Sequence, residues 1–197
     1  MTATNDNLRI ERLDRDGRRQ VYRDWMTCQF PKDELKPLSA IEQTIRKGLY
    51  EAWGMWNGDE LVAYAMLGYR NPGSVVLLDY YGVKPELKHR GYGSAFLEKL
   101  KDVYADWEMI VIESETPECI DDPENREIAL RRLGFYAKNG CADSGLRVKL
   151  FGVEFNVLVI PIKNNSMDIQ ILRRKYEDIY RGFLSNTYFD KFVRTHF

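Results

Sequence analysis

The sequence has few of the residues on which most hydrolases and metal sites depend. It contains two histidines, His89 and His196, and three cysteines, Cys28, Cys119 and Cys141. Ser-His-Asp and Cys-His nucleophiles and multi-histidine metal sites all need histidine, so we expect none of them and no bound metal. The cysteines lie far apart, form no Cys-x-x-Cys pair and are odd in number, so we expect reduced thiols.

The sequence also lacks an excess of basic charge and a long apolar run. Lysine and arginine number 29 against 30 aspartates and glutamates, which argues against a nucleic-acid surface. No apolar stretch approaches the ~20 residues of a membrane span. Residues 1–7 are polar and show no charged-then-apolar leader, so we expect a cytoplasmic protein. A chain of 197 residues that is 44% hydrophobic suits one ordinary domain with an appendage.

The most informative stretch, residues 83–97, places a glycine-bearing loop between a strand and a helix. The apolar run 75–81 predicts the strand, and apolar residues at helical spacing over 96–107 predict the helix. Amides at a helix N-terminus have no internal partners and bind anions. Gly91 and Gly93 let the backbone approach a phosphate without a Cβ, and basic side chains precede them.

Glycines at this spacing can also serve only the geometry of a tight strand-to-helix turn. The dinucleotide fingerprint Gly-x-Gly-x-x-Gly fails, because Phe96 takes the place of the third glycine. The Walker pattern Gly-x-x-x-x-Gly-Lys-Ser/Thr is absent as well. A nucleotide-phosphate binder of another fold therefore stays a weaker hypothesis.

The whole stretch resembles motif A of the GNAT N-acetyltransferase superfamily, Arg/Gln-x-x-Gly-x-Gly/Ala. Residues 88–93 read Lys-His-Arg-Gly-Tyr-Gly and follow Val-Lys-Pro-Glu at 83–86, where the family has Val-x-Pro-Glu. Lys88 replaces the usual Arg or Gln, which keeps a donor but loses a planar fork. Residues 135–141 resemble the family's later segment Phe-Tyr-x-Lys-x-Gly-Phe, with Cys141 in place of the last aromatic.

The apolar patterning gives an element order that agrees with the topology of that family. Asn57-Gly58 predicts a hairpin, and Asp122-Pro123 predicts a helix start. The expected strands are 8–11, 50–56, 61–69, 75–83, 109–112, 146–150 and 155–160, and the other expected helices are 20–26 and 41–47. We expect an α/β (α+β) GNAT fold over residues 1–163, with a mixed seven-stranded sheet and helices on both faces.

Residues 164–197 are expected to form a C-terminal helical extension. An apolar stripe starts at Ile169 and includes Tyr176 and Tyr180, and it continues to Phe197. Such a stripe packs on its own domain, contacts a second copy in a homodimer, or forms a wall of the substrate site.

The family resemblance implies acetyl-CoA as the acyl donor. The main-chain amides of residues 89–94 would hold its diphosphate, and the strand edge at Gly82 and Val83 would bind the pantetheine arm. Asn125 would reach the same arm, and a solvated surface asparagine is the alternative. The residues that the resemblance assigns to the loop are Lys88, His89, Arg90, Gly91, Tyr92, Gly93 and Ser94.

The acceptor in this family is normally an amine, here a small molecule or a peptide. An alkylammonium with a pKa of ~10.4 costs about 4.6 kcal/mol to deprotonate at pH 7, so a carboxylate is expected nearby. Asp79 lies in an apolar strand and is either such a base or a buried, hydrogen-bonded structural residue. Glu113 and Glu115 follow the next strand on one face and are either pocket residues or a solvated strand end.

Tyr136 matches the family tyrosine whose hydroxyl donates a proton to the leaving thiolate, and outside the motif it would be a core aromatic. The resemblance thus predicts an N-acetyltransferase in which a neutral amine attacks the thioester directly. The alternative is a GNAT-fold module that binds acyl-CoA as a sensor or scaffold without turnover.

Overall fold

The computed structural model describes residues 7–32, 34–163 and 168–197. Contacts between residues divide the chain into two units, Met1–Gly68 with Leu78–Val103 and Tyr69–Leu77 with Tyr104–Phe197. Strand β4 (Val75–Val83) contributes residues 75–77 to the second unit and residues 78–83 to the first. The expected division after residue 163 stays a prediction, and residues 164–167 lie outside the described chain.

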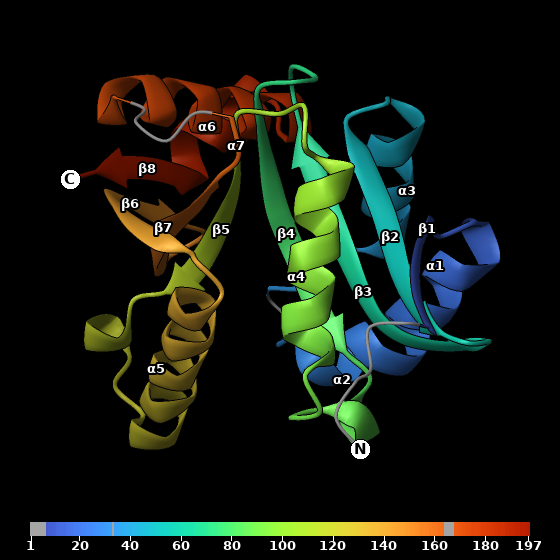
Figure 1. The fold of residues 1–197 in the computed structure, drawn as a ribbon. Helices are drawn as coiled ribbons and strands as arrows, with labels where there is room; N and C mark the ends of the chain where they lie inside the picture. The colour runs from blue at the N-terminus through green and yellow to red at the C-terminus, as the bar shows by residue number, and fades with distance from the viewer. Residues whose placement is uncertain (1–6, 33, 164–167) are drawn as a thin grey trace. The chain divides into compact units, whose positions relative to one another are not determined.

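The strands of the first unit lie in the order β1-β2-β3-β4 (Figure 1). The bounds of the first three are Leu8–Arg12 for β1, Tyr50–Asn57 for β2 and Glu60–Tyr69 for β3. Strands β1 and β2 and strands β2 and β3 pair antiparallel. The β2–β3 turn is the predicted hairpin, in which Gly58 has a φ of 59° that glycine adopts without strain.

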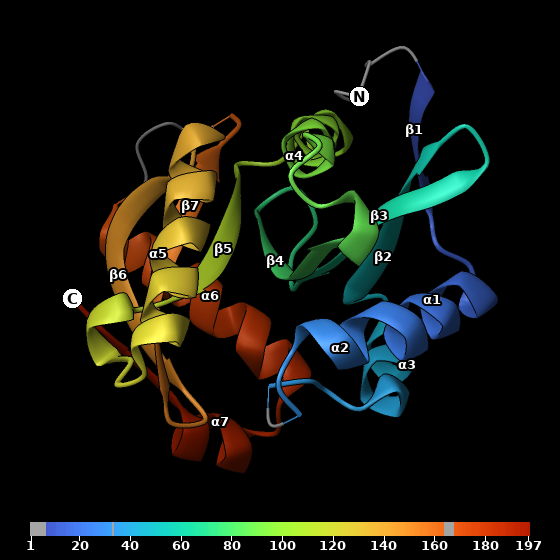
Figure 2. The same ribbon diagram turned by 90° about the horizontal axis from the view of Figure 1, so that it is seen from below.

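Helices lie on both faces of the strands in the first unit. Helix α1 (Arg15–Val21) continues through a π-helical turn (Tyr22–Met26) into α2 (Thr27–Gln29), and α3 (Leu38–Arg46) and α4 (Tyr92–Val103) follow. Figure 2 shows α4 on one face of these strands and α1, α2 and α3 on the other. Residues 62–67 of β3 are fully buried, because helices cover both of their sides.

The strands of the second unit lie in the order β5-β7-β6-β8, and neighbours pair antiparallel. The bounds are Met109–Glu115 for β5, Ala142–Leu150 for β6, Val153–Pro161 for β7 and Val193–His196 for β8, with helices α5 (Pro123–Lys138), α6 (Ile169–Phe183) and α7 (Asn186–Phe192). Leu172, Tyr176 and Ile179 of α6 join the buried core of this unit with side chains from β5, β6 and β7.

The expected number of strands was wrong. The described chain has eight strands, and the additional one, β8, was expected to continue the C-terminal helical stripe. Helix α7 ends at Phe192, and Val193 then pairs with Leu150 of β6. The reason is that Val193 is β-branched and buries its side chain in the core, while the strand covers an edge of β6 that would otherwise be open.

The α/β fold class is confirmed, and so are several local signals. Asp122 caps α5 by accepting the Asn125 N–H at 2.8 Å, with Pro123 at the first helical position. The helix expected over 20–26 starts earlier, because Asp14 accepts the Gly17 N–H at 2.7 Å and caps α1. Among the described helices, none has the length and apolar content that crossing a membrane requires.

Candidate functional site

The predicted phosphate loop lies in the first unit, between β4 and α4. A 3₁₀ turn (Pro85–Leu87) leads from the strand into the loop, where His89 has a φ of 64° and Gly91 a φ of 88°. A non-glycine residue at positive φ is uncommon and strained, and it persists only where the surrounding structure holds the backbone in place. A Cβ built on Gly91 would meet no atom within 4 Å, so the space over this backbone is open.

The loop presents exposed basic residues beside a helix N-terminus. Lys88, His89 and Arg90 are exposed, as is Ser94 in the first turn of α4. The Ala95 N–H donates to the Gly91 carbonyl at 3.0 Å, which is the first hydrogen bond of the helix. The backbone amides before Ala95 therefore have no partner within the helix. This arrangement has the chemistry of an anion site.

Two loop residues attach the start of α4 to the strands of the same unit. The Tyr92 hydroxyl accepts a hydrogen bond from the Asn57 side-chain amide at 2.9 Å, and the Tyr92 side chain is buried. The Gly93 carbonyl accepts a hydrogen bond from the Tyr81 hydroxyl on β4. The helix N-terminus is thereby fixed in position before any ligand binds.

The strand edge expected to bind the pantetheine arm is closely packed on one side. A Cβ on Gly82 would lie 2.5 Å from Tyr64 Cε1 and would also overlap Gln29 Oε1, so any larger residue there would force these side chains to shift. Gln29 Nε2 donates to the Val83 carbonyl at 2.9 Å, and Tyr64 Oη donates to Gln29 Oε1 at 2.7 Å. A carbonyl oxygen has two lone pairs, so the role of Val83 toward the cofactor stays a prediction.

Asp79 of β4 is a buried, hydrogen-bonded carboxylate. Its side chain is 7% exposed, and Oδ2 lies 2.5 Å from Lys36 Nζ. The Tyr50 hydroxyl donates to the same oxygen. The geometry matches the structural alternative for Asp79, while its role toward an amine is untested.

Glu113 and Glu115 lie in the second unit, within β5 rather than after it. The expected strand was too short, because both residues continue the pairing with β7, opposite Val157 and Phe155. The Tyr180 hydroxyl donates to Glu113 Oε1 at 2.7 Å, and the Tyr176 hydroxyl donates to the same oxygen. The reading of Glu113 as a solvated strand end is therefore wrong.

Glu115 and Tyr136 have partners on or near α5. Arg132 Nη1 lies 3.3 Å from Glu115 Oε2. Tyr136 is 6% exposed, and burial raises its pKa to about 12, with the charge of Arg132 opposing the rise. A hydroxyl with this pKa keeps its proton at neutral pH and can therefore donate a hydrogen bond or a proton.

The remaining predicted residue, Asn125, occupies the first turn of α5. The Asn125 backbone N–H donates to the Asp122 side chain that caps the helix, and Asn125 is exposed. The predicted residues are thus divided, with Asp79, Gly82, Val83 and residues 88–94 in the first unit and Glu113, Glu115, Asn125 and Tyr136 in the second.

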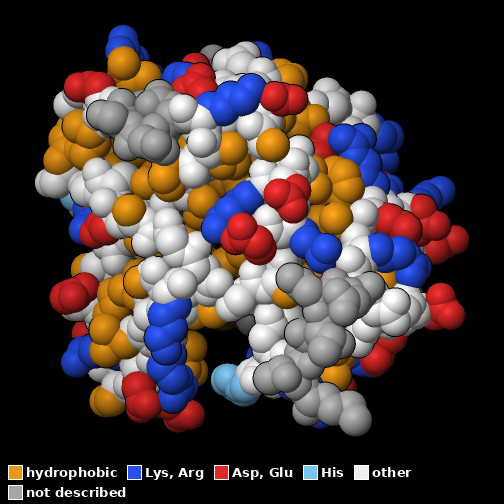
Figure 3. Space-filling model, viewed as in Figure 1, with side chains coloured by type: hydrophobic (Ala, Val, Ile, Leu, Met, Phe, Trp, Pro, Cys, Tyr) orange, Lys and Arg blue, Asp and Glu red, His pale blue; other side chains and the backbone are white. Residues whose placement is uncertain are grey.

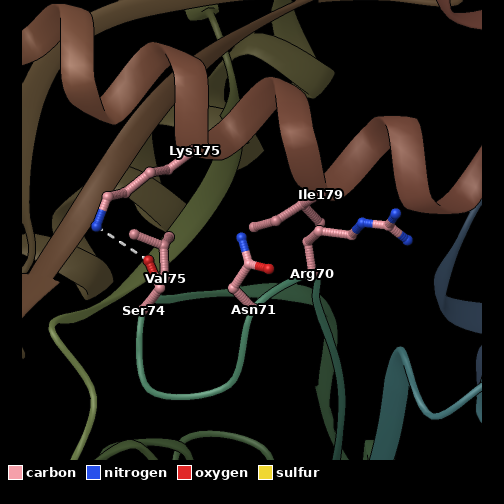
Figure 4. A pocket seen from close by; sticks show the side chains of 6 residues that line it. All are labelled: Arg70, Asn71, Ser74, Val75, Lys175 and Ile179. Carbon is pink, nitrogen blue, oxygen red and sulfur yellow. Dashed lines mark hydrogen bonds between the residues drawn. The ribbon is translucent and has the colours of Figure 1, made fainter.

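A small pocket in the second unit lies between the β3–β4 turn and α6 (Figure 4). Lys175 Nζ reaches Ser74 Oγ at 3.0 Å and the two carboxylate oxygens of Glu108 at 2.6 and 2.7 Å. The positive charge of Lys175 is balanced by the Glu108 carboxylate. This ion pair links α6 to the residue that precedes β5. The pocket is also lined by Arg70, Asn71, Val75 and Ile179.

Sequence reasoning missed the residues that hydrogen-bond to Asp79 and Glu113. Tyr50 and Lys36 were not singled out, and Tyr176 and Tyr180 were read only as part of an apolar stripe. A signal was present in the tyrosine pair, because two buried tyrosines four residues apart need acceptors for their hydroxyls.

Charges on the face of the molecule seen in Figure 3 are mixed rather than segregated. On the face in Figure 3, lysine and arginine side chains lie among aspartates and glutamates, in keeping with the net charge of −1. Among the described residues, no group of three or more histidines, cysteines, aspartates or glutamates is arranged to hold a metal ion.

Several solved structures of known proteins resemble this chain in fold. A putative GNAT acetyltransferase from Bacteroides thetaiotaomicron has a TM-score of 0.64 at 18% identity, over 88% of this chain and 98% of that one. An aminoglycoside 6′-N-acetyltransferase complexed with coenzyme A has a TM-score of 0.60 at 18% identity, over 81% and 99%. Spermidine N-acetyltransferase from Vibrio cholerae, with CoA and spermine, has a TM-score of 0.59 at 13% identity, over 80% and 97%.

These structures establish the likeness in fold, and a sequence comparison establishes the family. No curated protein matches this sequence. The family model described as "Acetyltransferase (GNAT) family" matches residues 18–135, which include the predicted phosphate loop and end at the first residue of the later segment 135–141. The chain therefore belongs to the GNAT acetyltransferase family.

Proposed function

We propose that the protein is an N-acetyltransferase that transfers an acetyl group from acetyl-CoA to a primary amine by direct attack on the thioester. The observation that carries this proposal is the loop before α4, which has exposed basic residues, a left-handed Gly91 and open space over its backbone. In a member of this family, such a loop is suited to the diphosphate of coenzyme A.

The residues proposed to bind the cofactor are those that match the motifs of the family. The amides of residues 89–94 and the side chain of Lys88 hold the diphosphate, and Gly82 and Val83 bind the pantetheine arm. Asn125 contributes to the same arm. Acetyl-CoA, when bound, supplies an activated acyl thioester, and the chain itself supplies binding, orientation and proton transfer.

Tyr136 is proposed as the acid that protonates the leaving sulfur. With its pKa raised to about 12 by burial, the hydroxyl is protonated throughout the physiological range. In this neutral form the hydroxyl can donate a hydrogen bond or a proton to the sulfur as the thiolate leaves.

Asp79, Glu113 and Glu115 are proposed to bind the acceptor as a cation and to assist its deprotonation. An ammonium of pKa ~10.4 is almost fully protonated at pH 7, which removes about 4.6 kcal/mol of reactivity. A carboxylate that accepts this proton recovers part of the loss. Asn or Gln variants at each position identify the base, because its variant recovers activity as the pH approaches the pKa of the amine.

The first test measures binding. Calorimetry with acetyl-CoA and with ATP is expected to give binding for the former alone. Gly91→Val should weaken acetyl-CoA binding at least about tenfold, because its side chain fills the space of the phosphate. Gly73→Val is the matched control, since Gly73 has a φ of 82° and equally open surroundings. Equal binding by the two variants would show that the loop is misassigned.

The second test measures turnover by release of free thiol from acetyl-CoA. The acceptor panel contains spermidine, an aminoglycoside and peptides with a free N-terminus or lysine, which are substrate types of structural relatives. Tyr136→Phe should lower kcat by about 10²-fold or more. Binding of acetyl-CoA without turnover on any amine would favour the alternative, a GNAT-fold sensor or scaffold.

A further inference from the structure

A lysine of this chain occupies a site with the chemistry of amine recognition. In the first unit, Lys36 Nζ lies 2.5 Å from Asp79 Oδ2. The same nitrogen lies 5.5 Å from the ring centroid of Tyr80 and 5.9 Å from that of Tyr50. A carboxylate together with aromatic rings within about 6 Å is a recognised means of binding an ammonium ion. We call Asp79, Tyr50 and Tyr80 the ammonium site.

The carboxylate of the ammonium site is more deeply buried than the lysine that occupies the site. The Asp79 side chain is 7% exposed, whereas the Lys36 side chain is 31% exposed. A buried carboxylate is costly without a partner, so the site requires a cation or donor. The partial exposure of Lys36 means that solvent reaches the side chain that supplies this cation.

The backbone around Lys36 is held by contacts that do not involve its ammonium group. The Lys36 N–H donates to the Tyr80 hydroxyl at 2.9 Å, and that hydroxyl donates to the Glu34 carbonyl at 2.8 Å. The Tyr22 hydroxyl donates to the Lys36 carbonyl at 3.2 Å. The side chain can therefore leave the ammonium site while the main chain keeps its place.

We propose that Asp79, Tyr50 and Tyr80 bind a primary alkylammonium ligand, and that Lys36 fills this site in cis, so that the ligand must displace it. The ligand would be the acceptor amine, and that identification rests on the function proposed above. Binding of an alkylammonium does not rest on it, because the binding needs no acetyl transfer.

The test opens the site and supplies the missing group. Lys36→Ala removes the atoms of a propylammonium ion, so n-propylammonium chloride is the probe. Calorimetry and thermal unfolding at constant ionic strength should show that it binds and stabilises this variant. If Lys36 fills the site nine-tenths of the time, the wild type binds about tenfold more weakly. Propanol and sodium chloride should have no such effect.

Two variants control the result. Lys32→Ala removes an exposed lysine from the same loop and should respond as the wild type does. Adding Asp79→Asn to Lys36→Ala should abolish the response to propylammonium. Equal responses of Lys36→Ala and wild type, or a response that survives Asp79→Asn, would overturn the proposal.

Two further outcomes remain decisive. If Lys36→Ala does not fold in buffer, its refolding is compared in propylammonium, in propanol and in sodium chloride. Rescue by propylammonium alone supports the site, and no rescue refutes it. Once an acceptor turns over, Lys36→Ala should lower its KM. Propylammonium binding without any turnover would leave the ammonium site intact and reject the acetyltransferase function.

Discussion

The hydrogen bonds from the α6 tyrosines to Glu113 give a direct test of how the structure holds this carboxylate. The Tyr180 hydroxyl donates to Glu113 Oε1 at 2.7 Å, and the Tyr180 residue is 3% exposed. Tyr180→Phe keeps the ring and removes only the hydroxyl. A hydrogen bond to a charged group contributes about 1.5–3 kcal/mol, and we expect that loss in the free energy of unfolding.

The corresponding change in melting temperature follows from the size of the chain. At about 2–4 °C per kcal/mol for a protein of this length, Tyr180→Phe should lower Tm by about 3–12 °C. Urea unfolding followed by fluorescence gives the free energy directly. In a double-mutant cycle with Glu113→Gln, the coupling between the two positions should be about 1 kcal/mol, because the Gln amide oxygen still accepts a hydrogen bond and only the contribution of the charge is lost.

The matched control is a tyrosine far more open to solvent. Tyr188 in α7 is 57% exposed, and Tyr188→Phe should change the free energy of unfolding by less than about 0.5 kcal/mol. If Tyr180→Phe behaves as Tyr188→Phe does, or if the cycle with Glu113→Gln shows no coupling, the carboxylate does not depend on the helix and the reasoning is refuted.

Three further predictions concern stability. Gly82→Ala places a Cβ 2.5 Å from a buried tyrosine ring and should cost about 1–3 kcal/mol in urea unfolding, whereas Gly134→Ala, with no atom within 4 Å, should cost nothing; equal effects would contradict the packing argument. Burial raises the pKa of Tyr136 to about 12, so this residue should lower stability from pH 10 to 12 by about 1.4 kcal/mol per pH unit. Tyr136→Phe should reduce the slope in thermal unfolding by that amount and leave the contribution of Tyr64, whose pKa burial also raises. Asp122→Ala removes the cap of α5 and should cost about 1 kcal/mol, a loss that the neighbouring Asp121→Ala should not reproduce.

Much of the fold was predicted from the sequence through interactions between residues that are close together in the chain. Asn57-Gly58 predicted a hairpin and Asp122-Pro123 a helix start, because turns and caps depend on residues adjacent in the chain. The loop before α4 was predicted for the same reason, since Gly91 supplies a positive φ at a strand-to-helix junction. The last strand was missed, because β8 exists only through pairing with β6.

The sequence by itself determined the α/β fold and the glycine loop between β4 and α4. The tertiary structure alone decided what the carboxylates of Asp79 and Glu113 contact. Asp79 meets Lys36 across 43 positions of the chain, and Glu113 meets Tyr180 across 67. Periodicity assigns a side chain to a face of its own strand or helix, but the partner across that face is chosen by packing between distant segments.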